Sequence, residues 1–71
     1  MNLRELRELN GIKVEDVART LNVTKTAYYR YEKGAREPSL IQIKQLAELF
    51  GESADDIIDA CLVSQVRSAN Q

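Results

Sequence analysis

Histidine and tryptophan are absent from this sequence, and cysteine and proline occur once each. Without histidine the commonest general acid or base is missing, and no serine has a visible activating partner. The single Cys61 cannot form an intrachain disulfide, and neither a second thiol nor a histidine is present to complete a zinc site. The sequence therefore predicts neither an enzyme nor a metal centre, and nothing in it indicates a cofactor.

Long apolar runs are also missing. No stretch approaches the length of a membrane span or of a signal peptide's hydrophobic region, and the start, MNLRELREL, is charged throughout. A chain of 71 residues with 44% hydrophobic and 30% charged residues has the size and composition of one globular domain. We therefore expect a cytoplasmic domain over residues 1–66, a flexible tail over 67–71, and no membrane contact.

The net charge is close to zero, but positive charge is concentrated in the middle of the chain. The formal net charge is −1, yet residues 19–36 carry five cations against Glu32 alone, a local charge of +4. The five cations are Arg19, Lys25, Arg30, Lys33 and Arg36. Residues 37–71 reverse the sign. Because a phosphate backbone responds to the charge within about 10 Å, this basic segment makes nucleic acid a candidate partner.

The spacing of apolar residues predicts an all-α protein of five short helices. Apolar positions recur every three or four residues, and β-branched residues nowhere alternate over the length of a strand. The helices are expected over 3–9, from Val14 to Leu21, from Thr24 to Gly34, from Ser39 to Gly51, and onward from Ser53. Asn22 tolerates the left-handed conformation of a tight turn. The short connection around it predicts a helix-turn-helix.

Two of these helices have a clear inward stripe. On the second helix the stripe consists of Val14, Val17, Ala18 and Leu21. On the fourth it consists of Leu40, Ile43, Leu46, Ala47 and Phe50. Ser39 and Gln42, three residues apart, form a predicted capping box at the start of the fourth helix.

The segment TKTAYYRYEKG divides into two faces when its residues advance by about 100° each. One arc holds Lys25, Thr26, Tyr29, Arg30 and Lys33. The opposite arc holds Ala27, Tyr28 and Tyr31, with Glu32 at its edge. We therefore expect Tyr28 and Tyr31 to be buried and Tyr29 to be exposed. Lys25 opposes the positive end of the helix dipole, which suits either a polyanion-binding site or an ordinary solvated charge.

Four segments in order carry a family resemblance: LRELRELNGI, VEDVARTLNVT, AYYRYEKGAREPSL and LAELFGESADDII. Over residues 3 to 58 the chain resembles the phage-repressor and Cro family of helix-turn-helix proteins, often called XRE-type. The resemblance implies a compact, lambda-repressor-like bundle of five helices. It also implies that the third helix enters the major groove of DNA, and that a homodimer binds a palindromic operator to repress or switch transcription.

Carried over by position, the resemblance implies specific contacts. Bases would be read by Lys25, Thr26, Tyr29 and Arg30. The DNA backbone would be contacted at Lys13, Val14, Lys33 and Arg36, and by the first amides of the fourth helix. Many members begin the second helix with Ser-Gln. Because valine offers no side-chain hydrogen bond, that phosphate contact shifts here to Lys13, to backbone amides or to Arg19.

The resemblance also bears on the core. It implies a structural ion pair between Arg7 and Glu32, which the inward angle of Glu32 fits. Tyr28 occupies a position that is usually a branched aliphatic residue. Its ring must therefore either widen the core or let its hydroxyl reach an outside partner.

The fifth helix has more apolar surface than one core needs. Its apolar positions span about 240°, whereas docking on a small core takes about 100° or somewhat more. The surplus predicts a homodimer interface at Ile58, Leu62, Val63 and Val66. Alternatively, Val63 and Val66 lie past the end of the helix and fold back. Cys61, at the centre of the stripe, is interpreted as a buried apolar residue rather than a redox sensor.

Three functions remain open from the sequence. The first is a transcriptional regulator, a repressor by preference, that binds double-stranded DNA in a sequence-specific manner. The second is a protein-interaction module, such as an antitoxin or antirepressor, that acts through its acidic and apolar C-terminal half. The third is single-stranded nucleic-acid binding by tyrosine stacking, which requires more than one exposed aromatic residue. No small-molecule ligand is expected.

Overall fold

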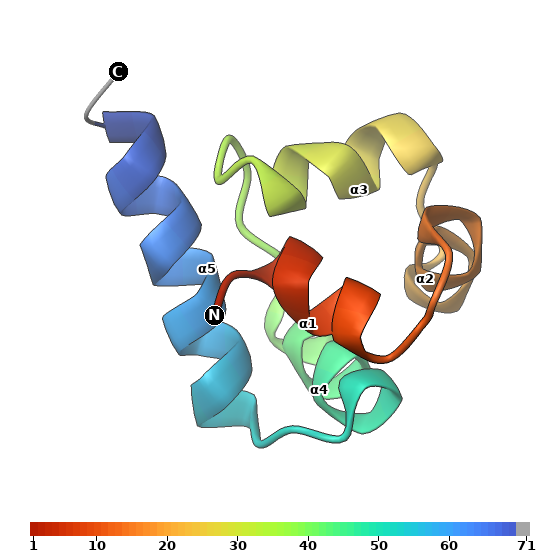
Figure 1. Cartoon of the computed structure of the whole chain (residues 1–71). Helices are drawn as coiled ribbons and strands as arrows, with labels where there is room; N and C mark the ends of the chain where they lie inside the picture. Colours follow the sequence, from red (N-terminus) through yellow and green to blue (C-terminus); the bar gives the residue numbers. More distant parts are fainter. Residues whose placement is uncertain (70–71) are drawn as a thin grey trace.

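The computed structural model of this chain is built from five helices (Figure 1). It describes the backbone of residues 1–69 and the side chains of residues 1–65. The helices are α1 (Leu3–Leu9), α2 (Val14–Leu21), α3 (Lys25–Glu32), α4 (Leu40–Phe50) and α5 (Ala54–Ala69). The predicted all-α fold of five helices is confirmed, and no strand occurs among the described residues.

The last helix is longer than expected. α5 continues to Ala69, so residues 67–69 of the expected tail belong to a helix. Residues 70–71 lie outside the described residues, and the flexible tail stays a prediction.

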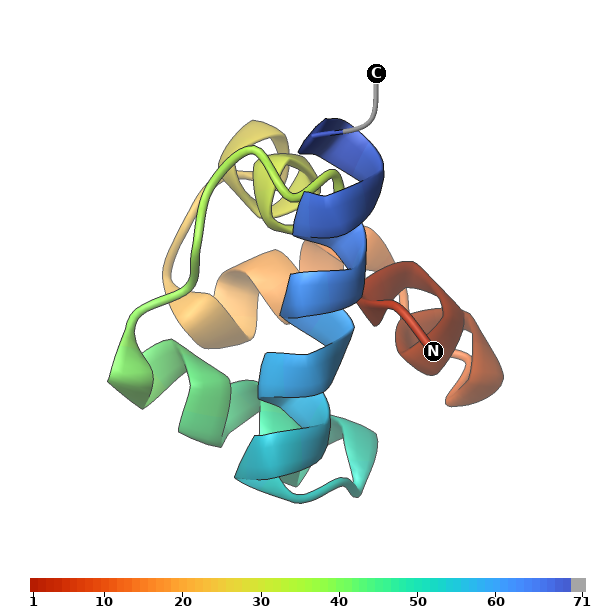
Figure 2. The same ribbon diagram turned by 90° about the vertical axis from the view of Figure 1, so that its left-hand side faces the viewer.

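The helices enclose one core, with α5 standing along one side of it. α5 packs against α4, α1 and α3, and α2 packs against α3 and α4. The first turns of α5 lie near the end of α4, and its last turns lie beside the C-terminal end of α3 (Figure 1). Turned by 90°, the structure shows the α3–α4 loop running alongside α5 (Figure 2). The loop and α5 are thus neighbours although they are far apart in the sequence.

Local capping signals place most helix ends where the sequence predicts them. The Thr24 hydroxyl accepts a hydrogen bond from the amide of Ala27 at 3.1 Å, which fixes the start of α3. Ser39 and Gln42 form the expected capping box at the start of α4. Asn22 adopts the left-handed conformation, with a φ of 59°. In contrast, Lys13 forms no side-chain cap at the start of α2.

The core contains the inward stripes of the helices, with one exception. The Tyr28 ring and Leu46 are fully buried in it, and Phe50 is nearly so. Leu40, expected on the inward stripe of α4, is 83% exposed, so that expectation is wrong. Leu40 is the first residue of α4, and the helix meets the core only further along, where Leu46 and Phe50 lie.

The described residues contain neither a membrane-spanning helix nor a candidate metal cluster. None of the helices there has the length and apolarity that crossing a bilayer requires. The same residues include no group of three or more acidic, histidine or cysteine side chains that could hold a metal ion.

Candidate nucleic-acid interface

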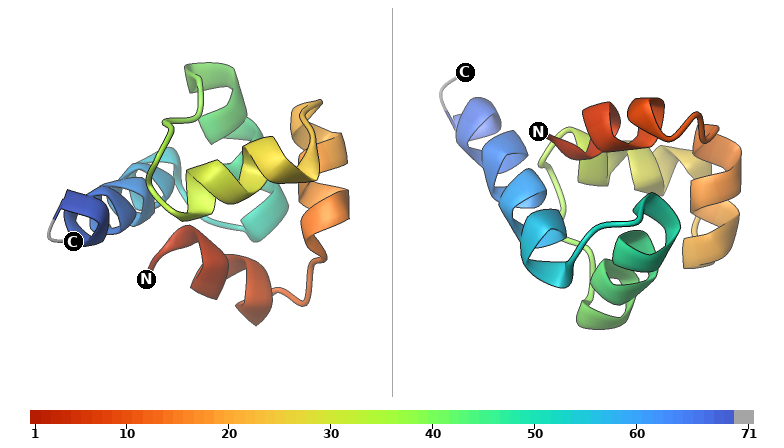
Figure 3. Two further views of the ribbon diagram at one scale, coloured as in Figure 1. Left: turned by 90° about the horizontal axis from the view of Figure 1, so that it is seen from above. Right: turned by 60° about the horizontal axis from the view of Figure 1, so that its bottom comes forward.

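The outward face of α3 gathers the four residues that the sequence analysis assigned to base reading. Lys25, Thr26, Tyr29 and Arg30 are all exposed, and Tyr29 is 44% exposed. Seen from above, α3 crosses the middle of the molecule, with α2 across one end and the α3–α4 loop leaving the other (Figure 3, left). The predicted division of α3 into two faces is confirmed. We call these four residues the outer face of α3.

The opposite side of α3 is packed by two tyrosines. Tyr28 is fully buried and Tyr31 is 4% exposed, as expected. Their ring centroids are 6.3 Å apart and the ring planes are nearly perpendicular, which is a favourable edge-to-face arrangement. The inner side of α3 is therefore held by aromatic packing, and its orientation fixes the orientation of the outer face.

Gln42 adds a polar anchor to this side of α3. Its Oε1 accepts hydrogen bonds from the Tyr31 hydroxyl at 3.0 Å and from the Ser39 amide at 2.9 Å. Its Nε2 donates a long hydrogen bond of 3.4 Å to the carbonyl of Leu21. One side chain thus connects the end of α2, the inner side of α3 and the start of α4. Sequence reasoning found only the capping role, because the two tertiary contacts have no local signal.

The predicted ion pair between α1 and α3 is present. Arg7 Nε donates to Glu32 Oε2 at 2.7 Å, and the two side chains are 13% and 6% exposed. Arg7 Nη1 also donates to the carbonyl of Ile12 at 3.2 Å. The hydrogen bond to Glu32 raises the pKa of the Arg7 guanidinium. This largely buried pair fixes the C-terminal end of α3 against α1.

The Tyr28 hydroxyl lies within the electrostatic influence of this pair. It is buried, and no group in the described chain forms a hydrogen bond of good geometry with it. Burial raises the pKa of Tyr28 far above its ordinary value, and the Glu32 carboxylate adds to the effect. The alternative in which this hydroxyl reaches an outside partner is therefore wrong, because the whole side chain is enclosed by the core.

The residues assigned to the DNA backbone fall in three places. Lys13 is exposed at the start of α2, and Lys33 and Arg36 are exposed at the end of α3 and in the loop after it. Arg19, on the solvent side of α2, has its Nη1 3.5 Å from Asp16 Oδ1. Val14 is only 9% exposed, which leaves its backbone amide as the group able to meet a phosphate.

The acidic residues of α5 begin at the end of that helix away from this surface. Asp55 and Asp56 lie in the first turn of α5, and Asp59 follows one turn later. That end of α5 is distant from α3 (Figure 1). The small negative net charge of the chain is therefore compatible with a basic surface around α3.

An apolar surface on α5 faces solvent. Ile58, Leu62 and Val63 are 38%, 50% and 39% exposed, and we call these three residues the apolar face of α5. Val63 and Val66 both lie within α5, so the alternative that places them past the helix end is wrong. The side chain of Val66 lies outside the described residues.

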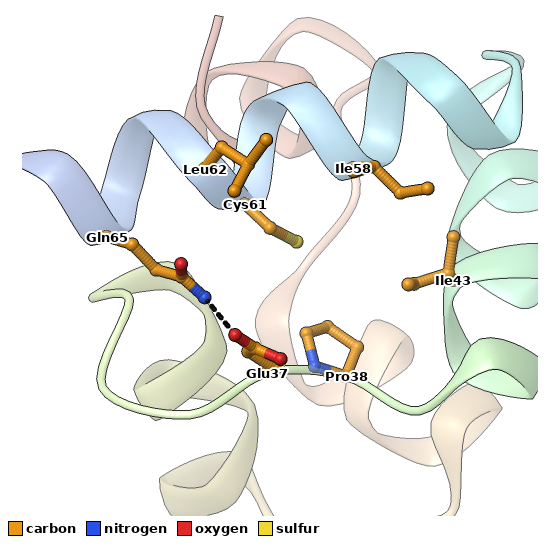
Figure 4. A pocket seen from close by; sticks show the side chains of 7 residues that line it. All are labelled: Glu37, Pro38, Ile43, Ile58, Cys61, Leu62 and Gln65. Carbon is orange, nitrogen blue, oxygen red and sulfur yellow. Dashed lines mark hydrogen bonds between the residues drawn. The ribbon is translucent and has the colours of Figure 1, made fainter.

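A pocket borders this apolar face. Its lining comes from α4, α5 and the α3–α4 loop: Glu37, Pro38, Ile43, Ile58, Cys61, Leu62 and Gln65 (Figure 4). Cys61 is buried, which confirms the expected packing role. Burial raises the pKa of its thiol, and the Glu37 carboxylate adds to the rise.

Comparison with known proteins identifies the family. Residues 3–57 match the family described as helix-turn-helix. The chain belongs to the XRE-type helix-turn-helix family. The match begins at the first residue of α1 and ends in the first turn of α5. It therefore covers all of α3 together with Arg7 and Gln42, which hold α3 in place.

Several curated proteins are similar to this helix-turn-helix chain, and two of them, from organisms of different genera, are provisionally named HTH-type transcriptional regulatory proteins. The one from Saccharolobus solfataricus is 38% identical over 69 residues, which are 97% of this chain and 21% of that protein. The one from Thermococcus kodakarensis is 40% identical over 57 residues, 80% of this chain and 18% of that protein. The chain thus spans about a fifth of the length of these relatives. No solved structure gives a significant match.

Proposed function

We propose that this chain is the sequence-specific, double-stranded DNA-binding module of a transcriptional regulator. The observation that carries the proposal is the outer face of α3, where Lys25, Thr26, Tyr29 and Arg30 are exposed together on a helix whose other side is anchored. An α-helix fits the major groove of B-DNA, where each base pair presents a distinct pattern of donors and acceptors. The names of the relatives support the regulatory part of the proposal.

The chemistry of the outer face suits base edges. Arg30 can donate two hydrogen bonds to O6 and N7 of a guanine. Lys25 can donate to a guanine or to a phosphate, and Thr26 can offer its hydroxyl or set its methyl against a thymine. Tyr29 can donate its hydroxyl to a base edge or to a phosphate. In this arrangement Arg30 is the main determinant of specificity.

Contacts to phosphates fix the module on the duplex. Lys33 and Arg36 contact the backbone at the C-terminal end of α3, and Lys13 contacts it from the start of α2. The first amides of α2 and α4 supply further donors. Arg19 contributes less, because Asp16 competes for its guanidinium.

A homodimer completes the proposal. The apolar face of α5, together with Val66, packs against the same surface of a second copy of the chain. The two α3 helices then read half-sites about 34 Å apart on a palindromic operator. Occupying such an operator represses transcription. Leu62→Glu places a charge in the proposed interface, so it should convert the dimer to a monomer in sedimentation equilibrium, whereas Glu48→Gln should not. A wild-type chain that is monomeric at high concentration contradicts the dimer.

Selection of duplexes from a random pool tests the DNA-binding function. We expect enrichment of one motif with two symmetric halves. Enrichment of a single, non-palindromic half-site would support the module and contradict the dimer. A pool that remains random at low salt contradicts the proposed function.

The exposed apolar face of α5 favours one second candidate, a protein-interaction module such as an antitoxin or antirepressor. Its partner would cover Ile58 and Leu62 and meet the acidic first turns of the same helix. Co-purification of one stoichiometric host protein, lost in Leu62→Glu, together with no selected duplex, would favour this candidate. Single-strand binding by stacking is disfavoured, because Tyr29 is the only exposed residue among the four aromatics of the chain.

A further inference from the structure

The turn after α3 lies in direct backbone contact with α5. Gly34 has a φ of +75°, and a Cβ added there would lie 2.6 Å from the carbonyl carbon and oxygen of Ser64 and 2.7 Å from the amide nitrogen of Gln65. Real Cβ atoms essentially never show such distances. Gly34 is therefore required both for its backbone conformation and for the close approach of α5.

The same turn is tightly joined to the end of α3. The amide of Gly34 donates to the carbonyl of Tyr31 at 3.2 Å. The amides of Ala35 and Arg36 both donate to the carbonyl of Arg30, at 3.0 and 3.3 Å. These bonds satisfy the last carbonyls of α3, end the helix and join the turn firmly to it. A displacement of Gly34 would therefore also displace its neighbours Lys33 and Arg36.

On the other side of the contact, α5 holds the loop at a second point. Gln65 Nε2 donates to Glu37 Oε1 at 2.8 Å (Figure 4). Pro38, the next residue, is buried. Ser64 is 4% exposed and its hydroxyl donates to the carbonyl of Ala60 at 3.2 Å, so no side chain separates the two backbones. One turn of α5 thus supports the α3–α4 loop at Gly34 and at Glu37.

We propose that Gly34 and Gln65 are positioning residues for the phosphate-contacting cations Lys33 and Arg36. α5 sets the distance of the α3–α4 loop from the molecule's core, and this distance places the two cations beside the DNA backbone when α3 occupies the groove. The proposal rests on the proposed DNA-binding function. Leu62 and Val63 on the apolar face belong to the same turns of α5 as Ser64 and Gln65.

Gly34→Ala and Gly51→Ala form a matched pair for the test. Both glycines have positive φ, +75° and +66°, so alanine strains the backbone at either position. A Cβ at Gly51 meets nothing within 4 Å, whereas one at Gly34 meets α5. Thermal unfolding of both variants comes first. The measurement is then the affinity for a random-sequence duplex, determined at several salt concentrations and corrected for the folded fraction.

We expect Gly34→Ala to weaken binding about tenfold and to lower the salt slope by about one to two phosphate contacts. Gly51→Ala should keep the wild-type affinity and slope. A change in stability alone cannot lower the salt slope of the folded protein, so the slope separates positioning from folding. Folded Gly34→Ala with the slope and affinity of the wild type would overturn the proposal.

Gln65→Ala keeps the test decisive if Gly34→Ala does not fold. It leaves both backbones in contact and removes only the hydrogen bond to Glu37. Gln45→Ala makes the same chemical change on α4. We expect a loss of about twofold and a shallower salt slope for Gln65→Ala, and no change for Gln45→Ala. An unchanged slope in Gln65→Ala refutes the positioning role alone, whereas a wild-type chain that binds no duplex refutes the proposed function as well.

Discussion

The eight residues of α3 are divided between two faces whose polar side chains differ in their contacts. On the inner face, Tyr31 is bonded to Gln42 and Glu32 is paired with Arg7. On the outer face, the side chains of Lys25 and Arg30 have no hydrogen bond or ion pair to any described residue. Tyr31 and Glu32 use their polar groups to hold the helix in place, whereas the polar side chains of the outer face are exposed to solvent.

This contrast separates stability from binding along one helix. A substitution on the inner face removes contacts that exist in the folded chain, so it changes the free energy of unfolding. A substitution on the outer face removes no such contact, so it should change affinity alone. Variants of the two faces therefore test the separation, and the largest loss of stability is expected on the inner face.

Glu32→Ala should cause one of the two largest losses of stability. It leaves the Arg7 guanidinium largely buried without its partner, and breaking such a pair costs about 3 kcal/mol or more. For a domain of this size that is a large part of the whole free energy of unfolding. Urea unfolding measures it, with the exposed Glu48→Ala as the control. A loss of less than about 1 kcal/mol would mean that the inner face does not depend on this pair.

Tyr28→Phe should stabilise the protein by about 1 kcal/mol. The substitution removes a buried hydroxyl that lacks a hydrogen bond of good geometry and keeps the ring in place. Tyr31→Phe is the matched control and should destabilise by a similar amount, because it removes the bond to Gln42. If both variants lose stability equally, the Tyr28 hydroxyl has a hydrogen-bond partner, as the Tyr31 hydroxyl does.

The pH dependence offers a second view of the same residue. Because burial raises the pKa of Tyr28 in the folded state, the folded chain binds this proton more tightly than the unfolded chain does. The stabilisation is complete below the ordinary tyrosine pKa of about 10 and is lost progressively as the pH rises above it. Unfolding free energies measured between pH 8 and about pH 11 should therefore fall less steeply in Tyr28→Phe than in the wild type. Equal slopes would argue against a buried neutral phenol.

Tyr29→Ala should have the smallest effect on stability, within about 0.5 kcal/mol. Its neighbour Tyr28→Ala should lose about 3 kcal/mol or more, because it empties a fully buried aromatic site. Urea unfolding of the two variants side by side compares adjacent residues on opposite faces. A large loss for Tyr29→Ala would show that the outer face also supports the fold.

The features that the sequence predicted well depend on local rules. The two faces of α3 follow from helical periodicity, and Asn22 and the Ser39–Gln42 capping box follow from backbone preferences over three or four residues. The resemblance added the Arg7–Glu32 pair, whose two residues are far apart in the chain.

The features that the sequence did not predict depend on contacts between distant segments. Nothing local shows that Gly34 touches Ser64, because a helix-ending glycine has the same sequence signal whether or not another backbone approaches it. Leu40 fits the periodicity of α4 but lies one turn short of the core, and periodicity cannot tell where a core ends. Val14 occupies a position that the resemblance assigns to contact with the DNA backbone, yet its side chain is buried and only its amide is left for that role.

The central claim is that the outer face of α3 reads sequence while the loop after it contacts phosphates. Its most direct test compares Arg30→Ala and Arg36→Ala on the selected operator and on random duplex, at matched salt. We predict that Arg30→Ala loses about 1–3 kcal/mol on the operator, little on random duplex, and its preference at one position of each half-site. Arg36→Ala should weaken both duplexes alike and lower the salt slope by about one. Equal losses on both duplexes for Arg30→Ala would contradict the account.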